Sequence, residues 1–419
     1  MSLRVLISGA SVAGPALAYW LVRAGCKVTV VERARTLRSE GQGVDVRDSA
    51  REVLKRMGIF DLIRSKSSHE EGISFVSSDN KAFASFGVDL ESGMGDSATS
   101  DIEILRGELA GILFDVTKDD VRYIFGDMVD SLEENEKEVE VSFASGTPKA
   151  AFDLVVAADG IGSKIRGMAF KTGAEQVRSL NSYISYFSVP KGDTDTMWAR
   201  AHWVKGGRCL VLRPDNMGRT RAFCMCTAYE KSDPRLARLD QASKQGVSEQ
   251  KALVQELFQD ADWEGPRLLK GMHDSDDFYM QHVAQVRLPR WSSGRVTVVG
   301  DAGYAASPFS GMGTSLAFLG AYVLAGEISK QPDDIPAALE SYERVLRPHV
   351  ESIQKLVPGI PWIVQPQSLW GIRVLETVVW GAGIVSGSWL ANLFSKAVGY
   401  LPIAGDVPFQ LPDYEAFKQ

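Results

Sequence analysis

The chain has 419 residues, of which 45% are hydrophobic and 24% are charged. This composition is typical of a globular protein, and the length allows a large core divided between two lobes that enclose a ligand. The net charge of -7 and the short basic clusters exclude nucleic acid as a partner. Four cysteines are too few to staple the chain, and with five histidines they show no zinc-ligand spacing. We therefore expect no metal and a reducing, cytoplasmic compartment.

The strongest structural prediction concerns residues 3–32. The apolar strand Arg4–Ser8 leads into Gly9-Ala-Ser-Val-Ala-Gly14, and a helix with apolar residues at helical spacing follows as far as Gly25. The β-branched strand Lys27–Glu32 then ends in an acidic residue. Strand, glycine-rich turn, helix and strand in this order form a βαβ unit, which is typical of dinucleotide binding.

Each residue of the glycine-rich turn has a physical reason to be there. Gly9 permits the tight turn and Gly14 permits close packing of the helix, whose free N–H groups favour a diphosphate. Ser11 stands where a second glycine is usual, and it is small enough to be tolerated. Glu32 is placed to accept the hydroxyls of an adenosine ribose, and we assign Arg33 to the same site.

Two further apolar segments, Phe152–Gly160 and Arg295–Asp301, are predicted strands that end in a glycine and an aspartate. Ligands of open α/β sheets bind at the carboxyl ends of strands, so we expect both turns beside the glycine-rich turn. Residues 178–285 contain alternating patterns, such as Tyr183–Val189, that predict an inserted antiparallel sheet. The acidic run Asp130–Glu140 predicts a solvated hairpin.

Together with the glycine-rich turn, the segments Asp153–Arg166 and Gly300–Gly313 carry a family resemblance. The sequence resembles the single-component FAD-dependent monooxygenases, that is, the para-hydroxybenzoate hydroxylase-like aromatic hydroxylases with their tetracycline-inactivating branch. Three motifs in the family's order cover residue 3 to about Pro348. Tyr304 replaces the histidine that usually follows Gly-Asp-Ala, but this removes no group that must donate to the flavin ring.

The resemblance implies that FAD is the cofactor and assigns its contacts. It places Gly9, Ser11 and Gly14 at the diphosphate and Glu32 at the adenosine ribose. The remaining assignments are Asp301 at the ribityl or ribose-side hydroxyls, Arg106 at the diphosphate-ribityl region, and Asp159, which serves both FAD and the nicotinamide cofactor, with Arg166 as its ion-pair partner. In Gly41–Arg47, which resembles the segment beside the isoalloxazine ring, Gly43 is the candidate. Asp45 and Arg47 line the flavin or the nicotinamide entry path, or they form a surface pair.

The loop Pro308–Gly313 has a physical interpretation of its own. Gly311 and Gly313 open a predicted helix, and the exposed N–H groups of a helix start stabilise the negative charge of a reduced flavin. The glycines also allow the flavin ring to approach closely. Pro308, Gly311 and Gly313 are therefore predicted cofactor residues.

The predicted fold class is α/β, with a Rossmann-type FAD-binding domain, an inserted antiparallel β-sheet domain for the substrate and a C-terminal helical segment. The FAD-binding domain is expected to be discontinuous. The predicted boundaries are 1–70, 101–177 and 286–349 for FAD binding, 71–100 and 178–285 for the substrate, and 350–419 for the C-terminal helices.

The resemblance implies that NADPH or NADH reduces FAD and that O₂ then forms a flavin C4a-hydroperoxide, which oxygenates a small apolar, aromatic or polycyclic substrate. Aromatic and apolar residues of the second lobe are candidates for the pocket wall. They are Tyr183, Tyr186, Phe187, Trp198, Trp203, Phe223 and Met225. No catalytic acid or base can be assigned, and His202 is a candidate by residue type alone.

Two alternatives stay open. One is an FAD-dependent reductase or dehydrogenase of the same fold that does not activate oxygen, and the other is a non-catalytic flavin-binding biosynthetic protein. The uncharged stretch Thr377–Ser395 has about the length of a membrane span. Its glycines and polar residues favour a buried or interface-lining helix over membrane contact. The sequence does not predict the oligomeric state.

Overall fold

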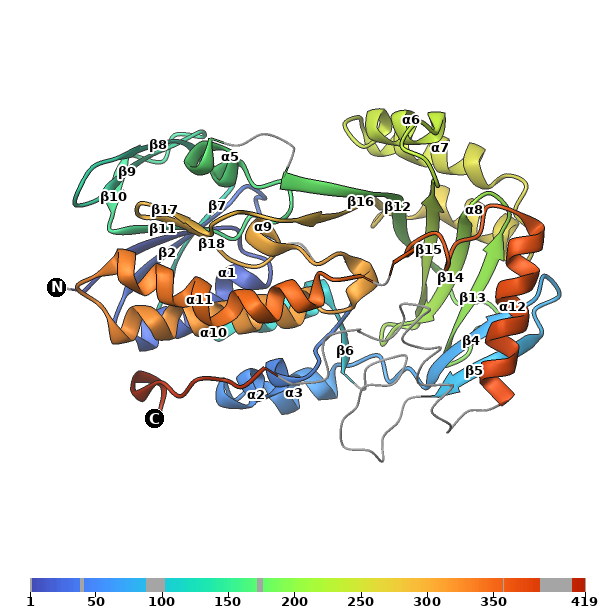
Figure 1. Cartoon of the computed structure of the whole chain (residues 1–419), viewed down its shortest axis with the longest axis horizontal. Coiled ribbons are helices and arrows are strands. Elements are labelled where there is room, and N and C mark those ends of the chain that lie inside the picture. Colours follow the sequence, from blue (N-terminus) through green and yellow to red (C-terminus); the bar gives the residue numbers. More distant parts are fainter. Residues whose placement is uncertain are drawn as a thin grey trace.

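The computed structural model describes residues 2–37, 41–87, 102–171, 176–356, 358–384 and 409–418. Two lobes lie side by side, and each is built around a large sheet (Figure 1). The predicted α/β fold class is confirmed. The first sheet carries the predicted cofactor turns, and the second sheet carries the predicted substrate residues.

The first sheet is mostly parallel. Its strands, in spatial order, are β17 (Ser292–Ser293), β18 (Val296–Val298), β11 (Leu154–Ala157), β1 (Arg4–Ser8), β2 (Lys27–Glu32) and β7 (Arg122–Phe125). Only β17 runs antiparallel to its neighbour. Because β1, β11 and β18 are parallel neighbours, the three turns that follow them lie at one edge of the sheet. Distant parts of the chain thus meet there, as the sequence predicted.

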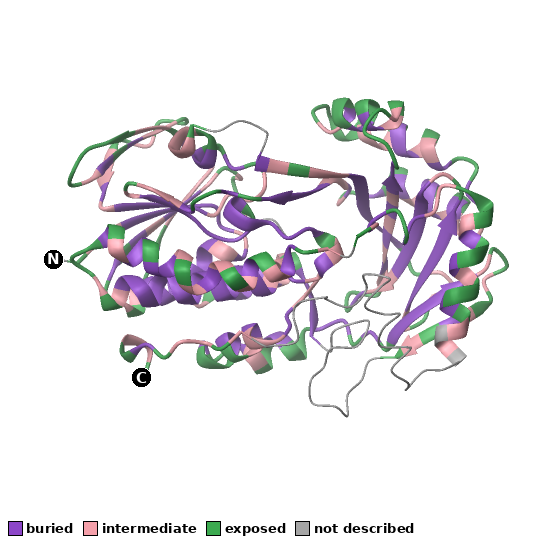
Figure 2. Ribbon diagram, viewed as in Figure 1, coloured by how far each residue is buried: buried purple, intermediate pink, exposed green. Residues whose placement is uncertain are grey.

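Both faces of this sheet are covered, which explains its apolar strands. The helices on one side are α1 (Ala13–Arg23), α10 (Gly313–Lys330) and α11 (Ile335–Ile353), and the other side carries α5 (Lys164–Phe170) and a sheet of β8 (Val129–Glu134), β9 (Val139–Phe143) and β10 (Ala150–Phe152) (Figure 1). Val5, Leu6 and Ile7 of β1 are fully buried between these layers (Figure 2). The acidic run lies on the predicted hairpin, in β8 and β9.

The second sheet has seven strands. They are, in spatial order, β16 (Tyr279–Val286), β12 (Val177–Pro190), β15 (Arg219–Thr227), β14 (Arg208–Pro214), β13 (Trp198–Val204), β4 (Gly72–Val76) and β5 (Ala82–Gly87). The prediction of an antiparallel sheet needs one correction, because β13 and β4 pair in parallel. Three helices, α6 (Pro234–Ala242), α7 (Val247–Phe258) and α8 (Gly265–Asp274), pack on one face.

A two-stranded ribbon lies where the lobes meet. It pairs β3 (Gly43–Asp45) with β6 (Glu103–Leu105), with Asp45 opposite Glu103 and Gly43 opposite Leu105. Short helices flank it: α2 (Ser49–Arg56), α3 (Phe60–Ser65) and α4 (Arg106–Asp115). Opposite residues of an antiparallel pair point to the same face, so Asp45 and Glu103 are neighbours.

The C-terminal segment contacts both lobes without forming one long helix. After α11, the chain forms α12 (Leu369–Ile384), which packs against the second sheet, and residues 409–418 return to the first lobe (Figure 1). There Tyr414 donates a hydrogen bond to Glu327 (2.8 Å), and Phe417 packs on Trp20 with ring centroids 4.7 Å apart. The C-terminal tail therefore completes the core around α1 and α10.

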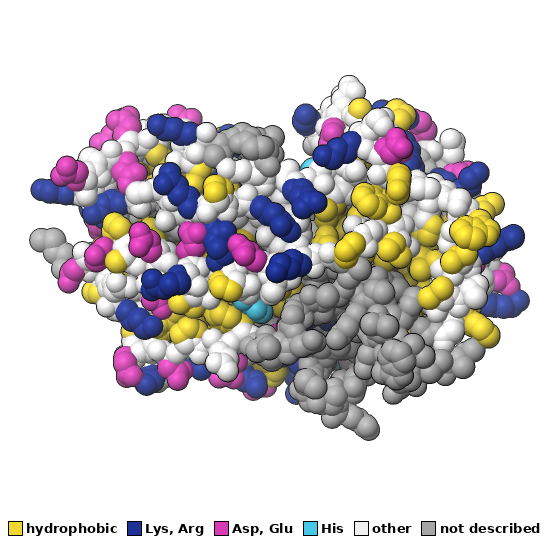
Figure 3. Space-filling model, viewed as in Figure 1, with side chains coloured by type: hydrophobic (Ala, Val, Ile, Leu, Met, Phe, Trp, Pro, Cys, Tyr) yellow, Lys and Arg dark blue, Asp and Glu magenta, His cyan; other side chains and the backbone are white. Residues whose placement is uncertain are grey.

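The uncharged stretch Thr377–Ser395 is only partly visible, because residues 385–395 lie outside the described residues. Within the described part of the chain, no helix is long and apolar enough to cross a membrane. The outer face of α12 nevertheless exposes Trp370, Val374 and Val378, and hydrophobic side chains gather on the surface of this lobe (Figure 3).

Candidate active site

The turn between β1 and α1 has no room for side chains at its glycines. Gly9 has a φ of +112°, and a Cβ there would lie 2.5 Å from the carbonyl oxygen of Ala158. A Cβ on Gly14 would lie 1.9 Å from the carbonyl oxygen of Gly9. No side chain caps α1 at Val12, so the first N–H groups of the helix are left for an anion.

Polar side chains surround this turn. Arg106, the first residue of α4, donates from Nε to the hydroxyl of Ser11 at 3.1 Å, and its side chain is exposed. The carboxylate of Glu32 accepts hydrogen bonds from the backbone N–H groups of Ala10 and Ala34, both at 2.9 Å. A carboxylate can accept about four hydrogen bonds, so Glu32 keeps capacity for a ribose hydroxyl. Arg33 is exposed beside it.

Asp159 lies at the end of β11, but the predicted ion pair with Arg166 is wrong. Arg166 instead donates to the backbone oxygens of Ala302 (2.9 Å) and Ile161 (2.7 Å). Asp159 accepts one backbone hydrogen bond, from Lys164 at 3.1 Å, and its Oδ1 is buried without a partner. Burial raises the pKa of this carboxyl.

The turn after β18 meets the start of α10. Asp301 is exposed, and a Cβ added to Gly313 would lie 3.8 Å from its Oδ1. Gly311 has a φ of +64°, which favours glycine, and lies next to the guanidinium of Arg47. No side chain caps α10. Pro308, at the start of this loop, is exposed.

Asp45 and Arg47 form an ion pair of 2.8 Å that is buried, because their side chains are only 16% and 3% exposed. The interpretation of these residues as a surface pair is therefore wrong. The backbone N–H of Arg47 also donates to the hydroxyl of Ser315 in α10 at 3.0 Å. The hydrogen bond from Arg47 to Ser315 joins the segment that follows β3 to α10, the helix that begins at Gly313.

In the second lobe, the strands divide the predicted wall residues between opposite faces. Phe223 and Met225 pack with Tyr186 and with Phe309 of the Pro308–Gly313 loop, so they face the first lobe. Tyr186 also makes an edge contact with Phe223, with ring centroids 4.8 Å apart. These aromatic rings form a wall opposite the edge that carries Asp301.

Three of the predicted wall residues, Tyr183, Phe187 and Trp198, and also His202 do not belong to this wall. Tyr183 and Phe187 lie on the opposite face of the sheet, under α6 to α8, and the Tyr183 hydroxyl donates to Asp240. Trp203 lies on the same face as Phe223 and Met225, but it is covered by α12 and donates to the carbonyl of Val364. Trp198 packs on β4 and β5 at the outer end of the sheet. His202 has both ring nitrogens within hydrogen-bond distance of other groups, which are Val76 O and Asp262.

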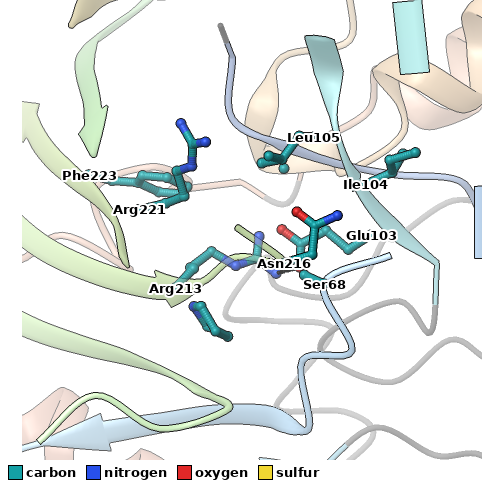
Figure 4. A pocket seen from close by; sticks show the side chains of 10 residues that line it. Ser68, Glu103, Ile104, Leu105, Arg213, Asn216, Arg221 and Phe223 are labelled. Carbon is teal, nitrogen blue, oxygen red and sulfur yellow. Dashed lines mark hydrogen bonds and ion pairs between the residues drawn. The ribbon is translucent and has the colours of Figure 1, made fainter. Parts of the chain in front are cut away.

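A pocket lies between the ribbon and the second sheet (Figure 4). Leu105 and Ile104 of β6 stand on one side and Arg221 and Phe223 of β15 on the other (Figure 4). Its lining residues are Gly43, Ser68, Glu103, Ile104, Leu105, Arg213, Pro214, Asn216, Arg221 and Phe223. Both the predicted flavin segment, through Gly43, and the predicted substrate wall, through Phe223, contribute to it.

Buried charges line the polar side of this pocket. Arg213 donates to both carboxylate oxygens of Glu70 (2.8 and 2.9 Å) and to Glu103 (2.7 Å). Both glutamates are buried, and the Arg213 side chain is 17% exposed. This arrangement can hold or exchange a proton at the pocket surface.

Comparison with known proteins identifies the family. A model of the family described as FAD binding domain matches residues 2–356. This chain belongs to that family. The FAD cofactor and the predicted family resemblance are confirmed, and the chain is an FAD-dependent oxidoreductase of the monooxygenase class.

Two curated relatives align along nearly the whole chain. Monooxygenase CTB7 of Cercospora beticola is 37% identical and covers 98% of this chain and 97% of its own length. Flavin-dependent monooxygenase eupH of Phoma sp is 34% identical and covers 99% and 98%. The crystal structure of tetracycline destructase Tet(51) superposes with a TM-score of 0.76 at 29% identity, covering 99% of this chain and all of that one.

The geometry fits the cofactor of the FAD binding domain family. The turn at Gly9 and Gly14 excludes side chains, two helix starts lack side-chain caps, and Asp159 has a buried oxygen without a partner. A diphosphate and sugar hydroxyls would satisfy these groups. Tyr304, which replaces the family's histidine, points away from this edge and bonds the hydroxyl of Tyr342 (2.9 Å) in the core.

Sequence reasoning missed the charged members of the pocket. Glu103 lies in the apolar run Ile102–Leu105, and Arg213 follows Leu212 at the end of a buried strand. A charged residue inside an apolar strand is a signal for a buried ion pair or a site. The partner of each charge could not be read, because Glu70, Glu103 and Arg213 are far apart in the chain.

Proposed function

We propose that FAD lies along the carboxyl edge of the first sheet and that the substrate occupies the pocket between the lobes. In this arrangement Gly9, Ser11, Gly14 and Arg106 hold the diphosphate, and Glu32 and Asp301 hold sugar hydroxyls. When bound, FAD supplies the redox chemistry, because it accepts a hydride from NADPH or NADH and its reduced form reacts with O₂.

The proposal rests on the pocket, because the segment proposed to contact the flavin and the wall proposed to contact the substrate both line it. Gly43 on its floor belongs to the segment proposed to run beside the isoalloxazine ring, and Phe223 belongs to the aromatic wall. Leu105 and Phe223 line this small pocket and would contact a ring placed against it. We therefore propose a small aromatic or polycyclic substrate, oxygenated within this pocket.

Residues near the flavin loop would stabilise negative charge. The start of α10 at Gly313 points its N–H groups toward the proposed flavin position, beside the buried Arg47. Gly311 gives the loop the turn that brings the helix start to the edge. We also propose a cytoplasmic enzyme, which the four buried free cysteines support.

The first test is a spectrum followed by turnover. Purified protein should be yellow with bound FAD, and its oxidation of NADPH or NADH should be stimulated by phenolic, indolic or polyketide compounds. Oxygen uptake should match nicotinamide oxidation, and the product should be heavier by one oxygen atom. Nicotinamide oxidation that needs no oxygen would instead favour a reductase, and a protein that binds FAD without any turnover would favour the non-catalytic alternative.

The two faces of the second sheet give a matched pair of variants. We expect Phe223→Ala to raise KM for an aromatic substrate about tenfold, because an aromatic contact contributes about 0.5–1.5 kcal/mol beyond area burial. Tyr183→Phe should leave KM unchanged, because Tyr183 faces α6 and not the pocket. Steady-state kinetics with the stimulating compound measures both. An effect in Tyr183→Phe equal to that in Phe223→Ala would contradict the assignment of the faces.

A further inference from the structure

One tyrosine hydroxyl of the second lobe is buried without a hydrogen bond. Tyr279 is the first residue of β16, and its hydroxyl oxygen has no hydrogen-bond partner among the residues that the structure describes. Burying a hydroxyl removes its bonds to water and costs free energy unless another partner replaces them, so proteins rarely leave one unsatisfied. A hydroxyl in this state indicates a ligand that accepts its hydrogen bond.

The ring that carries this hydroxyl is held in place by the aromatic wall. Tyr279 lies opposite Tyr186 of β12, and the two rings stack with centroids 4.8 Å apart and an interplanar angle of 18°. The same cluster contains Phe309 of the Pro308–Gly313 loop. The stack leaves the ring little freedom to turn its hydroxyl toward another partner, and it places Tyr279 beside the proposed flavin loop.

The groups around the hydroxyl belong to the first lobe. Burial raises the pKa of Tyr279, whereas the charge of Arg106 and the backbone N–H of Gln42 oppose the increase. Both groups are therefore close to the hydroxyl, although it forms no hydrogen bond with either. Gln42 precedes Gly43 in the segment proposed to run beside the isoalloxazine ring. A side chain of the second lobe thus reaches the proposed position of FAD.

Gln42 carries a second polar atom in the same state. Its side-chain oxygen is also buried, with no hydrogen-bond partner in the described part of the chain, whereas its backbone carbonyl accepts from the N–H of Arg106 at 3.0 Å. The pyrimidine edge of an isoalloxazine ring carries both acceptor oxygens and a donor N–H group. A hydroxyl donor and an amide oxygen match such an edge, whereas an apolar substrate ring would satisfy neither.

We propose that the hydroxyl of Tyr279 donates a hydrogen bond to the isoalloxazine ring of FAD, so that the second lobe takes part in holding the cofactor. The FAD contacts assigned above all come from the first lobe and its flanking segments, whereas Tyr279 lies on the sheet that carries the substrate wall. The inference rests on the proposed function, because it uses the proposed position of the flavin.

The variant Tyr279→Phe removes the hydroxyl and keeps the ring that stacks on Tyr186. We expect its affinity for oxidised FAD to fall about two- to tenfold, which is the effect of one hydrogen bond. Flavin fluorescence during titration of the apoprotein measures the affinity. The stability of the apoprotein toward urea should stay the same or rise, because the hydroxyl that is removed has no partner to lose.

The reduction potential of the bound flavin gives a second measurement. Reduced flavin is negatively charged, and hydrogen bonds to charged acceptors are about twice as strong as those to neutral ones. Tyr279→Phe should therefore lose about fivefold more affinity for reduced than for oxidised FAD. This difference lowers the two-electron potential by about 20 mV, which an equilibrium titration of the FAD-loaded protein against a reference dye detects.

Tyr183→Phe is the matched control, because it makes the same substitution in the strand that pairs with β16. The hydroxyl of Tyr183 faces α6 and donates to Asp240. Its removal should leave the FAD affinity and the reduction potential unchanged, and it should lower the stability of the apoprotein. The two variants are thus expected to differ in opposite directions in cofactor binding and in folding.

Three results would overturn the proposal. The first is wild-type FAD affinity in Tyr279→Phe. The second is an apoprotein that is destabilised as much as Tyr183→Phe, or that no longer folds, because the hydroxyl would then serve the fold. The third is weaker binding with an unchanged potential, because the hydrogen bond would then go to the ribityl chain instead of the ring.

These measurements are independent of turnover. A protein that shows both expected shifts but takes up no oxygen with any compound would contradict the proposed function and leave the contact of Tyr279 with the flavin standing. Weakened FAD binding in Gly14→Ala together with wild-type binding in Tyr279→Phe would support the proposed position of the diphosphate and overturn the contribution of the second lobe.

Discussion

Replacing Gly14 with alanine is expected to lower the affinity for FAD about tenfold to a hundredfold. The new Cβ would lie 1.9 Å from the carbonyl oxygen of Gly9, and a backbone atom cannot rotate away as a side chain can. The turn that carries Gly9 would have to move, and overpacking of this kind costs about 1–3 kcal/mol. Flavin fluorescence during titration of the apoprotein with FAD measures the change.

The control for this variant is Gly111→Ala in α4. A Cβ at Gly111 would meet no atom within 4 Å outside the adjacent backbone of its own helix, so FAD affinity should stay at the wild-type level. Denaturant unfolding of each apoprotein shows whether the Gly14→Ala chain has folded. A folded Gly14→Ala protein with wild-type affinity for FAD would show that the diphosphate does not bind at this turn.

Replacing Arg213 with alanine is expected to lower the free energy of unfolding by about 3–5 kcal/mol at neutral pH. The change leaves the buried carboxylates of Glu70 and Glu103 without their cation, and unpaired buried charges are costly. Urea denaturation of the FAD-loaded protein measures the loss. Arg238→Ala removes the exposed partner of Glu256 and should leave the free energy of unfolding almost unchanged, because water screens this pair.

The loss in Arg213→Ala should depend on pH. Without Arg213, the folded-state pKa values of Glu70 and Glu103 rise further, whereas the unfolded values stay ordinary. Below the unfolded pKa both states are protonated, so the penalty is absent there, and it grows as pH rises toward the folded pKa. Arg213→Ala should therefore be destabilised less at mildly acid pH than at mildly alkaline pH. An equal loss at both would contradict the buried charge group.

The cofactor edge was predictable because its rules are local. Gly9 has a positive φ and Gly14 has a close contact with Gly9 in the same turn, and the strands that bring Asp159 and Asp301 beside them are continuous apolar runs. The predicted ion pair of Asp159 with Arg166 was wrong, because closeness in the sequence does not determine the direction in which a side chain points. Ser163 caps α5 and accepts from the backbone of Arg166, whose side chain then reaches the backbone of Ala302.

The substrate wall could not be predicted from the sequence, because the middle of the second sheet is covered on both faces. In β12 the residues from Asn181 to Val189 are all buried, so no alternation separates Tyr183, which faces the helices, from Tyr186, which faces the flavin loop. In β15 buried and half-buried residues do alternate, and there Phe223 and Met225 fall on one face together. Alternation in a strand's sequence predicts which face a residue lies on only where one face of the sheet is less buried than the other.

The packing of residues 409–418 has a consequence for how the protein is made. Phe417 covers Trp20, and the hydroxyl of Tyr322 donates to the carbonyl of Pro412 at 2.9 Å. Chains emerge from the ribosome in order, and domains generally fold as units during synthesis. The lobe whose first strand is made at residue 4 thus lacks part of its core until residues 409–418 are translated. The seven strands that the structure describes in the second sheet, by contrast, are complete by residue 286, so this sheet can form before residues 409–418 are made.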